Sequence, residues 1–250
     1  IISYYDHFIN DIEAPDLILR FGKKPLSKKL LSLLEKYRDI TYLFRFRTIY
    51  NDDTLQSNLI NHVEVKDCEY NNSWINTFKN NDILIKDKIK LIDKESKLNE
   101  FIFSSQIAKQ FPEDSNVFIG NSLIIRAFNS FSKKRFNKIK FHSNRGTSGI
   151  DGNIATSLGI ASQSNQNNYL VIGDQSFMHD VGSLQILAEK KQKLTIFIVN
   201  NYGGSIFNYL PNLKKIDSNS FENYILNKHS NDFKSIVKSY GLKYKKISSI

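Results

Sequence analysis

The sequence predicts an α/β protein built on parallel sheets. Short apolar runs alternate with segments of helical periodicity: residues 169–172 and 194–199 are apolar, and residues 177–189 between them have a helical pattern. Each apolar run is followed directly by a polar pair, Gly173-Asp174 and Asn200-Asn201. Continuous apolar strands joined by a helical crossover are typical of parallel βαβ units, which bind ligands at the carboxyl ends of their strands.

The N-terminal part predicts a similar unit. Residues 16–21 read as a strand, residues 27–37 as an amphipathic helix with Ser27 as its N-cap, and residues 41–46 as the next strand. Residues 51–90 are polar, with a weak helical pattern near Trp74 and no recognisable chemistry. The charged run at residues 86–97 is a natural boundary, so we expect one domain over 1–93 and a second over 94–250.

The second domain is expected to begin with a helix over residues 98–111 and a strand that ends at Ile119. After a Gly120-Asn121 turn, a predicted helix places Ser122 and Arg126 one turn apart on one face. A hydroxyl beside a guanidinium suits a carboxylate ligand. The same pattern also fits a helix cap followed by a surface arginine.

A Gly-rich loop over residues 143–152 precedes a helix of small residues. Alone, it is only a weak indication of a nucleotide site. Farther along, we expect a helix over residues 231–240 and a short strand from Leu242.

The two polar pairs of the βαβ unit indicate a metal site. Asp174 offers a carboxylate, Asn201 an amide oxygen, and Gly203 a main-chain carbonyl where the backbone can turn tightly. An oxygen-only set of this kind suits Mg²⁺ or Mn²⁺ completed by phosphate oxygens and water. Either pair alone would also occur as ordinary turn chemistry.

The composition limits the classes of partner. The net charge is +10, but the lysines are scattered and no nucleic-acid-binding motif occurs, so we expect anionic metabolites rather than nucleic acid. A single cysteine, Cys68, excludes an intrachain disulfide and favours a reducing compartment. No apolar run is long enough to span a membrane. Because the chain opens with Ile-Ile and its one methionine is Met178, we expect it to be part of a longer protein.

Four motifs together resemble one family. Gly173-Asp174 and Asn200-Asn201 resemble the Gly-Asp and Asn-Asn signature of thiamine-diphosphate enzymes, with the 24 residues from Ser176 to Val199 as the spacer after Gln175. GNSLIIR from Gly120, NRGTSGIDG from Asn144 and NNYGGSIFNYLP from Asn200 are similar to the 2-succinyl-5-enolpyruvyl-6-hydroxy-3-cyclohexene-1-carboxylate synthases of that superfamily. The resemblance implies a thiamine-diphosphate-binding fold: a partial central domain followed by the diphosphate-binding domain.

In that family, 2-oxoglutarate is decarboxylated and its succinyl unit is added to isochorismate in menaquinone or phylloquinone biosynthesis. The resemblance implies thiamine diphosphate with Mg²⁺ or Mn²⁺ as cofactors, a homodimer or homotetramer, and a bacterial cytoplasm or plastid stroma. It assigns the metal to Asp174, Asn201 and Gly203; the cofactor to Gly146, Ser148, Ile150, Gly173, Asp174, Gln175, Ser176 and Asn201; and the substrates to Lys28, Ser122, Arg126, Arg145, Ile206 and Phe207.

Within this assignment Ile150 would lie beneath the cofactor and bend it, while the diphosphate would meet free N–H groups near Gln175 and Ser176, where a helix is expected to begin. Tyr202 departs from the family, which has small polar residues at this position. The family's activating glutamate belongs to an N-terminal domain that this sequence lacks, so we expect these 250 residues alone to be inactive. Two alternatives remain: an acetolactate-synthase-like carboligase, and a non-catalytic remnant that binds a diphosphate.

Overall fold

The computed structural model describes residues 2–22, 24–44, 58–60, 64, 72–94, 98–132 and 138–248. The chain divides into two compact units: Ile1–Glu95 with Asn129–Lys133, and Ser96–Phe128 with Lys134–Ile250. The domain boundary expected after residue 93 stays a prediction. Cys68 and residues 45 and 46 of the predicted strand lie outside the described residues.

The first unit contains a parallel sheet in the order β1-β2-β3. Ser27 caps helix α1, because its Oγ accepts a 3.0 Å hydrogen bond from the backbone N–H of Leu30. The strand, capped helix and strand expected here are therefore confirmed over the described residues. Their bounds are β1 Ile18–Phe21, α1 Lys28–Lys36, a 3₁₀ turn η3 Arg38–Ile40, β2 Thr41–Phe44 and β3 Asn58–Ile60.

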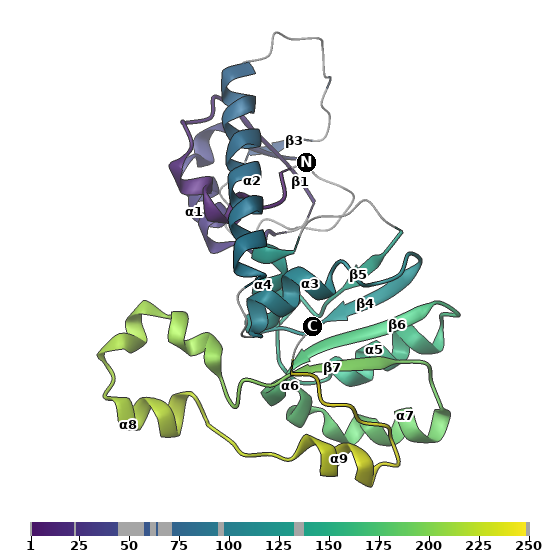
Figure 1. Cartoon of the computed structure of the whole chain (residues 1–250). Coiled ribbons are helices and arrows are strands. Elements are labelled where there is room, and N and C mark those ends of the chain that lie inside the picture. The colour runs from purple at the N-terminus through teal and green to yellow at the C-terminus, as the bar shows by residue number, and fades with distance from the viewer. Residues whose placement is uncertain are drawn as a thin grey trace. The chain divides into compact units, whose positions relative to one another are not determined.

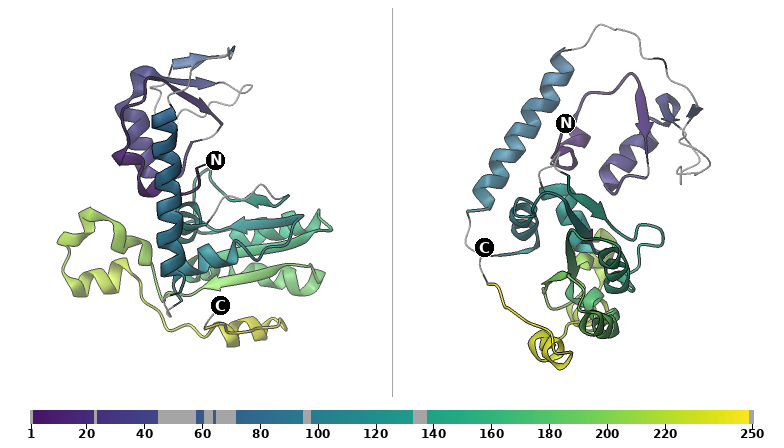
Figure 2. Two further views of the ribbon diagram at one scale, coloured as in Figure 1. Left: turned by 45° about the horizontal axis from the view of Figure 1, so that its top comes forward. Right: turned by 90° about the vertical axis from the view of Figure 1, so that its right-hand side faces the viewer.

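A long helix, α2 (Asn72–Ile92), dominates the rest of this unit (Figures 1 and 2). Oδ1 of Asp82 on α2 accepts hydrogen bonds from the backbone N–H groups of Ser3 (2.8 Å) and Tyr4 (2.7 Å). The ring of Phe78 packs edge-on against Phe8 at 5.9 Å. The helix thus holds the 3₁₀ turns η1 (Tyr5–His7) and η2 (Ile9–Asp11), an attachment that its weak sequence pattern did not predict.

The second unit contains a four-stranded parallel sheet in the order β5-β4-β6-β7. The strands are β4 Ser115–Ile119, β5 Lys140–His142, β6 Asn167–Gly173 and β7 Thr195–Val199. The chain passes outward from β4 to β5 and then returns across β4 to β6. The direction of winding therefore reverses between β4 and β6, which is where open α/β sheets bind ligands.

Alternate side chains of the strands supply two apolar layers. Val117, Ile119 and Val171 pack beneath α3 (Glu100–Ile107) and α4 (Leu123–Phe131). Phe118, Leu170 and Ile172 pack against the opposite layer, formed by α5 Asn153–Ser162, α6 Asp174–His179, α7 Leu184–Lys190 and α9 Phe233–Ser239. Figure 1 shows these elements along the sheet. Each fully buried apolar side chain contributes about 1.5–3 kcal/mol, so this double burial holds the sheet rigid beneath its loops.

The crossover from β6 to β7 differs from the single helical segment expected over residues 177–189. It is divided into α6, the 3₁₀ turn η4 (Val181–Ser183) and α7. Asp180 lies at the break, where its carboxylate accepts hydrogen bonds from the Ser183 hydroxyl (2.7 Å) and the backbone N–H of Ala155 (2.9 Å). These bonds replace helical ones and divide the crossover.

Beyond β7 the chain forms short turns: η5 Ser205–Tyr209, η6 Pro211–Lys215, α8 Ser218–Ser220 and the π-helical η7 Phe221–Ile225. The helix expected over residues 231–240 is α9. The strand expected from Leu242 is wrong, because residues 242–247 have no regular structure; Leu242 and Tyr244 instead pack on the apolar core. Among the described residues, no helix combines the length and apolar character needed to cross a membrane.

Candidate functional site at the carboxyl edge of the sheet

The polar motifs of the second unit meet at one edge of its sheet. Because all four strands are parallel, the turns after β4, β5, β6 and β7 lie at the same edge. Gly173 at the end of β6 pairs in register with Val199 at the end of β7. Asp174 and the Asn200-Asn201 pair therefore follow neighbouring, register-locked strands.

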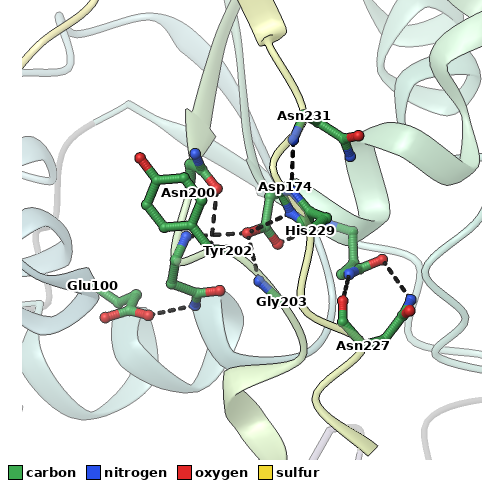
Figure 3. A network of polar contacts seen from close by, with 10 residues as sticks. Glu100, Asp174, Asn200, Tyr202, Gly203, Asn227, His229 and Asn231 are labelled. Atoms are coloured by element: carbon green, nitrogen blue, oxygen red, sulfur yellow. Dashed lines mark hydrogen bonds and ion pairs between the residues drawn. The ribbon is translucent and has the colours of Figure 1, made fainter. Parts of the chain in front are cut away.

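Asp174 organises the turn after β7. Its carboxylate is 2% exposed, and Oδ2 accepts hydrogen bonds from the backbone N–H groups of Asn201 and Gly203, both at 3.1 Å. Oδ1 accepts from the N–H of Gln175 at 2.6 Å. Figure 3 shows Asp174 at the centre of this network. The residues predicted from separate motifs thus form one site.

His229 is a member of this site that sequence reasoning missed. Its Nε2 lies 3.2 Å from Oδ2 of Asp174, an ion-pair distance that lacks hydrogen-bond alignment. The adjoining Asn227 contacts Gln175, whose side-chain amide donates to the Asn227 carbonyl at 2.8 Å. No local pattern marks His229, because its position depends on a long loop folding back over the turn.

Asn201 presents a free amide oxygen. Its Oδ1 is buried and has no hydrogen-bond partner in the described part of the chain. Its Nδ2 donates to Oε1 of Glu100 at the start of α3. Figure 3 shows Glu100 beside the turn. A buried polar atom without a partner is costly, and a bound ligand is one explanation of it.

Gly203 and Tyr202 give the turn its shape. Gly203 has φ = 151°, and a Cβ there would lie 2.6 Å from the carbonyl oxygen of Leu226. The Gly203 carbonyl accepts a 3.0 Å hydrogen bond from the N–H of Ser205, which leaves one lone pair free. Tyr202 has φ = 63°, a left-handed conformation that L side chains adopt at a cost. The departure of Tyr202 from the family pattern therefore falls on a residue in an unfavourable conformation.

Asn121 joins the turn after β4 to the Gly-rich loop. It is 1% exposed, and its Nδ2 donates to the carbonyl oxygens of Asn144 (2.9 Å) and Gly149 (2.7 Å). Its Oδ1 accepts from Nη1 of Arg145 at 2.7 Å. Both N–H groups and one oxygen lone pair of this amide therefore form hydrogen bonds with the loop. Asn121 is a second residue that sequence reasoning missed, although it lies inside a motif singled out for its neighbours.

The predicted pair Ser122 and Arg126 differs from expectation. Helix α4 begins at Leu123, and Ser122 lies outside it with φ = 71°. Nη1 of Arg126 donates to the main-chain carbonyl of Ser122 at 2.7 Å, so the contact does not involve the hydroxyl. The expectation that both residues lie on one helix face is therefore wrong, because the turn adopts a left-handed residue before the helix starts.

Arg126 and Arg145 lie close enough to influence each other. Burial lowers the pKa of the Arg126 guanidinium, and the positive charge of Arg145 lowers it further. Neither guanidinium forms an ion pair with a carboxylate of the described residues. Two such cations in one region favour an anionic ligand.

The Gly-rich loop is fixed to α6. Ser176 is 2% exposed, and its Oγ donates to the carbonyl of Ile150 at 2.5 Å and accepts from Nδ2 of Asn153 at 3.0 Å. The Ile150 side chain is half-buried. Ser148 has φ = 61°, and a Cβ at Gly146 would meet no atom within 4 Å. The Ser176 hydroxyl is thus occupied by the loop itself.

The remaining predicted residues are not among those joined by the hydrogen bonds described above. Ile206 and Phe207 belong to η5, and Phe207 lines a cavity of about 270 Å³ with Leu210, Leu213, Phe221 and Leu226 among others. Lys28 is the exposed first residue of α1 in the first unit. Their roles remain predictions.

The described residues contain no cluster of three or more His, Cys, Asp or Glu side chains that could hold a metal ion. The predicted set has only one such side chain, since its other donors are an amide and a main-chain carbonyl. Oδ1 of Asn201 is buried without a partner in the described residues, and the N–H of the same residue bonds the Asp174 carboxylate, so this oxygen set fits a hard cation.

The similarities of the chain to known proteins agree with this geometry. It is 28% identical over 265 residues to the 2-succinyl-5-enolpyruvyl-6-hydroxy-3-cyclohexene-1-carboxylate synthase of Lysinibacillus sphaericus (strain C3-41), covering 100% of this chain and 46% of that protein. It is 30% identical over 275 residues to the protein of the same name from Listeria monocytogenes serotype 4b, again covering 100% and 46%. For Desulfitobacterium hafniense the identity is 30% over 262 residues, covering 98% and 46%.

The chain therefore spans about half the length of the relatives it matches. A solved structure from Mycobacterium smegmatis, described as thiamin diphosphate-dependent, has a TM-score of 0.47 and 16% identity over 61% of this chain and 27% of that chain, too low a likeness to argue from. Residues 120–249 match the family described as thiamine pyrophosphate enzyme, C-terminal TPP binding domain. The chain belongs to the thiamine pyrophosphate enzymes, and it carries their C-terminal TPP-binding domain.

Proposed function

We propose that this chain forms the diphosphate and metal site of a thiamine-diphosphate-dependent synthase that decarboxylates 2-oxoglutarate and adds the succinyl unit to isochorismate. The observation that carries the proposal is the hydrogen bonding of Asp174 to Asn201 and Gly203 in the turn after β7, where the Asn201 amide oxygen is buried without a described partner. The names of the relatives support the choice of substrates.

The metal, Mg²⁺ or Mn²⁺, would be held by the carboxylate of Asp174, Oδ1 of Asn201 and the carbonyl of Gly203. The carboxylate accepts three N–H groups and keeps one free lone pair, on Oδ1, and the Asn201 oxygen has no other described partner. One charged and two neutral oxygen donors leave coordination positions for phosphate oxygens and water.

The cofactor would be bound by residues around this metal and by the Gly-rich loop. Ile150 would support it from below; the other assigned contacts are Gly146, Ser148, Gly173, Gln175 and Ser176. Asn121 fixes the loop through its bonds to Asn144 and Gly149, so the binding surface is formed in advance. Thiamine diphosphate, when bound, supplies the electron sink for decarboxylation and carbon–carbon bond formation.

Arg126 and Arg145 would bind the carboxylates of the substrates. They gather two positive charges at the edge of the sheet where the turn after β7 also lies. Residues 200–204 of that turn are called the metal turn below. Lys28, Ser122, Ile206 and Phe207 complete the assignment drawn from the resemblance. The same proposal includes assembly as a homodimer or homotetramer and a location in a bacterial cytoplasm or plastid stroma. It also includes an activating glutamate supplied from outside these residues.

The test uses the protein with any flanking sequence that its gene encodes. Loss of isochorismate absorbance is followed with 2-oxoglutarate, thiamine diphosphate and Mg²⁺, for the unmodified protein, Arg145→Ala and Arg38→Ala. Arg38 is a matched control, since its side chain is 56% exposed and its ion pair is with the neighbouring Asp39. We expect turnover that requires both substrates, a loss of about 100-fold or more in Arg145→Ala, and little change in Arg38→Ala.

Other outcomes point elsewhere. Consumption of pyruvate alone would indicate the acetolactate-type carboligase. Mg²⁺-dependent binding of thiamine diphosphate without turnover would indicate the non-catalytic remnant. Absence of cofactor binding would overturn the proposal.

A further inference from the structure

The side chain of Glu100 makes a long-range contact with the metal turn. Glu100 is the first residue of α3, and its Oε1 accepts a hydrogen bond from Nδ2 of Asn201, 101 positions away in the sequence. The N-terminus of α3 is already capped by Asn99, whose Oδ1 accepts from the N–H groups of Phe101 and Ile102, both at 3.0 Å. The carboxylate of Glu100 is therefore not needed as the helix cap.

The contact determines which way the Asn201 amide faces. A side-chain amide has an oxygen and an NH₂ group of similar size, so packing alone distinguishes its two orientations weakly. An ionised carboxylate only accepts hydrogen bonds, so Glu100 can bind the NH₂ group and not the oxygen. The opposite end of the amide, Oδ1, is left buried without a partner.

The start of α3, which carries Glu100, lies against η5. Glu100 is half-buried, and its negative charge adds to the effect of burial in raising the pKa of the Tyr209 phenol. The ring of Tyr209 packs edge-on against Phe101, the residue after Glu100, at 6.1 Å. The start of α3 is therefore anchored to η5, which immediately follows the metal turn.

We propose that Glu100 is a positioning residue that orients the Asn201 amide so that its oxygen faces the bound metal. The inference rests on the metal site of the proposed function and adds to it a residue that does not touch the metal. Outer residues that orient a metal ligand typically affect metal affinity by about 10–100-fold when removed.

The experiment measures metal binding directly. Mn²⁺ is titrated into protein saturated with thiamine diphosphate, and free Mn²⁺ is followed by its electron paramagnetic resonance signal. Glu100→Gln and Glu100→Met remove the same charge and have similar size, but only glutamine keeps an acceptor for Nδ2. Glutamine keeps this acceptor but adds an NH₂ group that can bind Oδ1 instead, so we expect Glu100→Gln to bind Mn²⁺ more weakly than the unmodified protein but more tightly than Glu100→Met, which should bind about tenfold or more weakly.

Glu113 provides the matched control. It is exposed and precedes β4, so Glu113→Gln and Glu113→Met should both bind Mn²⁺ as the unmodified protein does. Thermal unfolding without metal separates orientation from general damage, because a merely structural role would lower the unfolding midpoint without distinguishing Gln from Met in Mn²⁺ affinity. If Glu100→Met does not fold, Glu100→Ala replaces it.

The outcomes are distinct. Unchanged affinity in Glu100→Met overturns the inference and leaves the metal site intact. Equally weakened Mn²⁺ binding in Glu100→Gln and Glu100→Met would assign the change in affinity to the lost charge and would also overturn the inference. No Mn²⁺ binding by the unmodified protein means that the proposed function itself has failed.

Discussion

Nη1 of Arg145 donates a 2.7 Å hydrogen bond to Oδ1 of Asn121, so the turn after β4 holds a side chain of the Gly-rich loop. The same buried amide donates to two carbonyl oxygens of that loop. One side chain therefore fixes both the backbone expected to approach the cofactor and a cation expected to bind substrate.

Asn121→Ala should destabilise the fold, because it leaves two loop carbonyls and one guanidinium without their partner. We expect a loss of about 2–4 kcal/mol in the free energy of unfolding, measured by urea denaturation. Asn223→Ala is the control: Asn223 is exposed and its side chain donates to the exposed Asn219, so the loss should stay within about 0.5 kcal/mol. Equal losses at both positions would contradict a special role for Asn121.

Alanine in place of glycine should have opposite effects at two positions. At Gly203 the new Cβ would lie 2.6 Å from the Leu226 carbonyl at φ = 151°, so we expect a loss of about 3 kcal/mol or more. Gly159 lies within α5 and has open space around it, so Gly159→Ala should stabilise the fold by about 0.5–1 kcal/mol. Thermal or urea unfolding checks both. A tolerated alanine at Gly203 would mean that the turn is not as tight as described.

Tyr202→Asn should stabilise the protein. Asparagine adopts left-handed φ more readily than tyrosine, and the Tyr202 side chain is 55% exposed, so little burial is lost. We expect a gain of about 0.5–1 kcal/mol in the free energy of unfolding. The same change at Tyr224, 81% exposed in the π-helical η7, should give no gain. A loss of stability at Tyr202 would show that its ring contact with His229, at 6.1 Å, outweighs the backbone.

Asp174→Asn should abolish tight metal binding, since it removes the only carboxylate of the predicted set. We expect the Mg²⁺ affinity, measured by calorimetry at saturating thiamine diphosphate, to fall by about 100-fold or more. Asp217→Asn, at the exposed cap of α8, is the matched control and should not change it. Retained Mg²⁺ affinity in Asp174→Asn would exclude this carboxylate as a ligand.

His142 should make stability depend on pH. Burial lowers its pKa, and the charge of Lys140 adds to the shift. The unfolded chain then binds a proton at this histidine more readily than the folded protein does. Neutral His142 therefore contributes to the free energy of unfolding above the unfolded-state pKa of about 6.5, and this contribution is lost as pH falls through the lower folded-state pKa. Unfolding followed across this range should show a shallower slope in His142→Asn and in Lys140→Gln. An unchanged slope in both would rule out this source.

The sequence predicted those features that depend on local pattern. Apolar runs located β6 and β7, Ser27 was recognised as a cap, and the parallel order placed Asp174 and Asn201 at one edge. In each case neighbouring residues carry the physical cause, which is burial on both faces of a strand or satisfaction of a helix terminus.

Features set by distant contacts could not be predicted. His229 contacts Asp174, and Glu100 contacts Asn201, through folds of the chain that no local pattern specifies. Ser122 adopts a left-handed conformation that sequence does not mark in a serine, so the expected helix face began one residue too early. The break at Asp180 depends on hydrogen bonds to Ala155 in another helix.

Gly173 pairs in register with Val199, so the positions of Asp174 and Asn201 do not depend on how many residues connect β6 to β7. The ladder of β6 and β7, with the hydrogen bonds from Asn201 and Gly203 to Asp174, sets the distance between the two turns. The 24 residues from Ser176 to Val199 can therefore gain or lose residues around η4 without moving Asp174 relative to Asn201. Searches for this site in other sequences should accordingly allow the number of residues between the two motifs to vary and should require each motif directly after a strand.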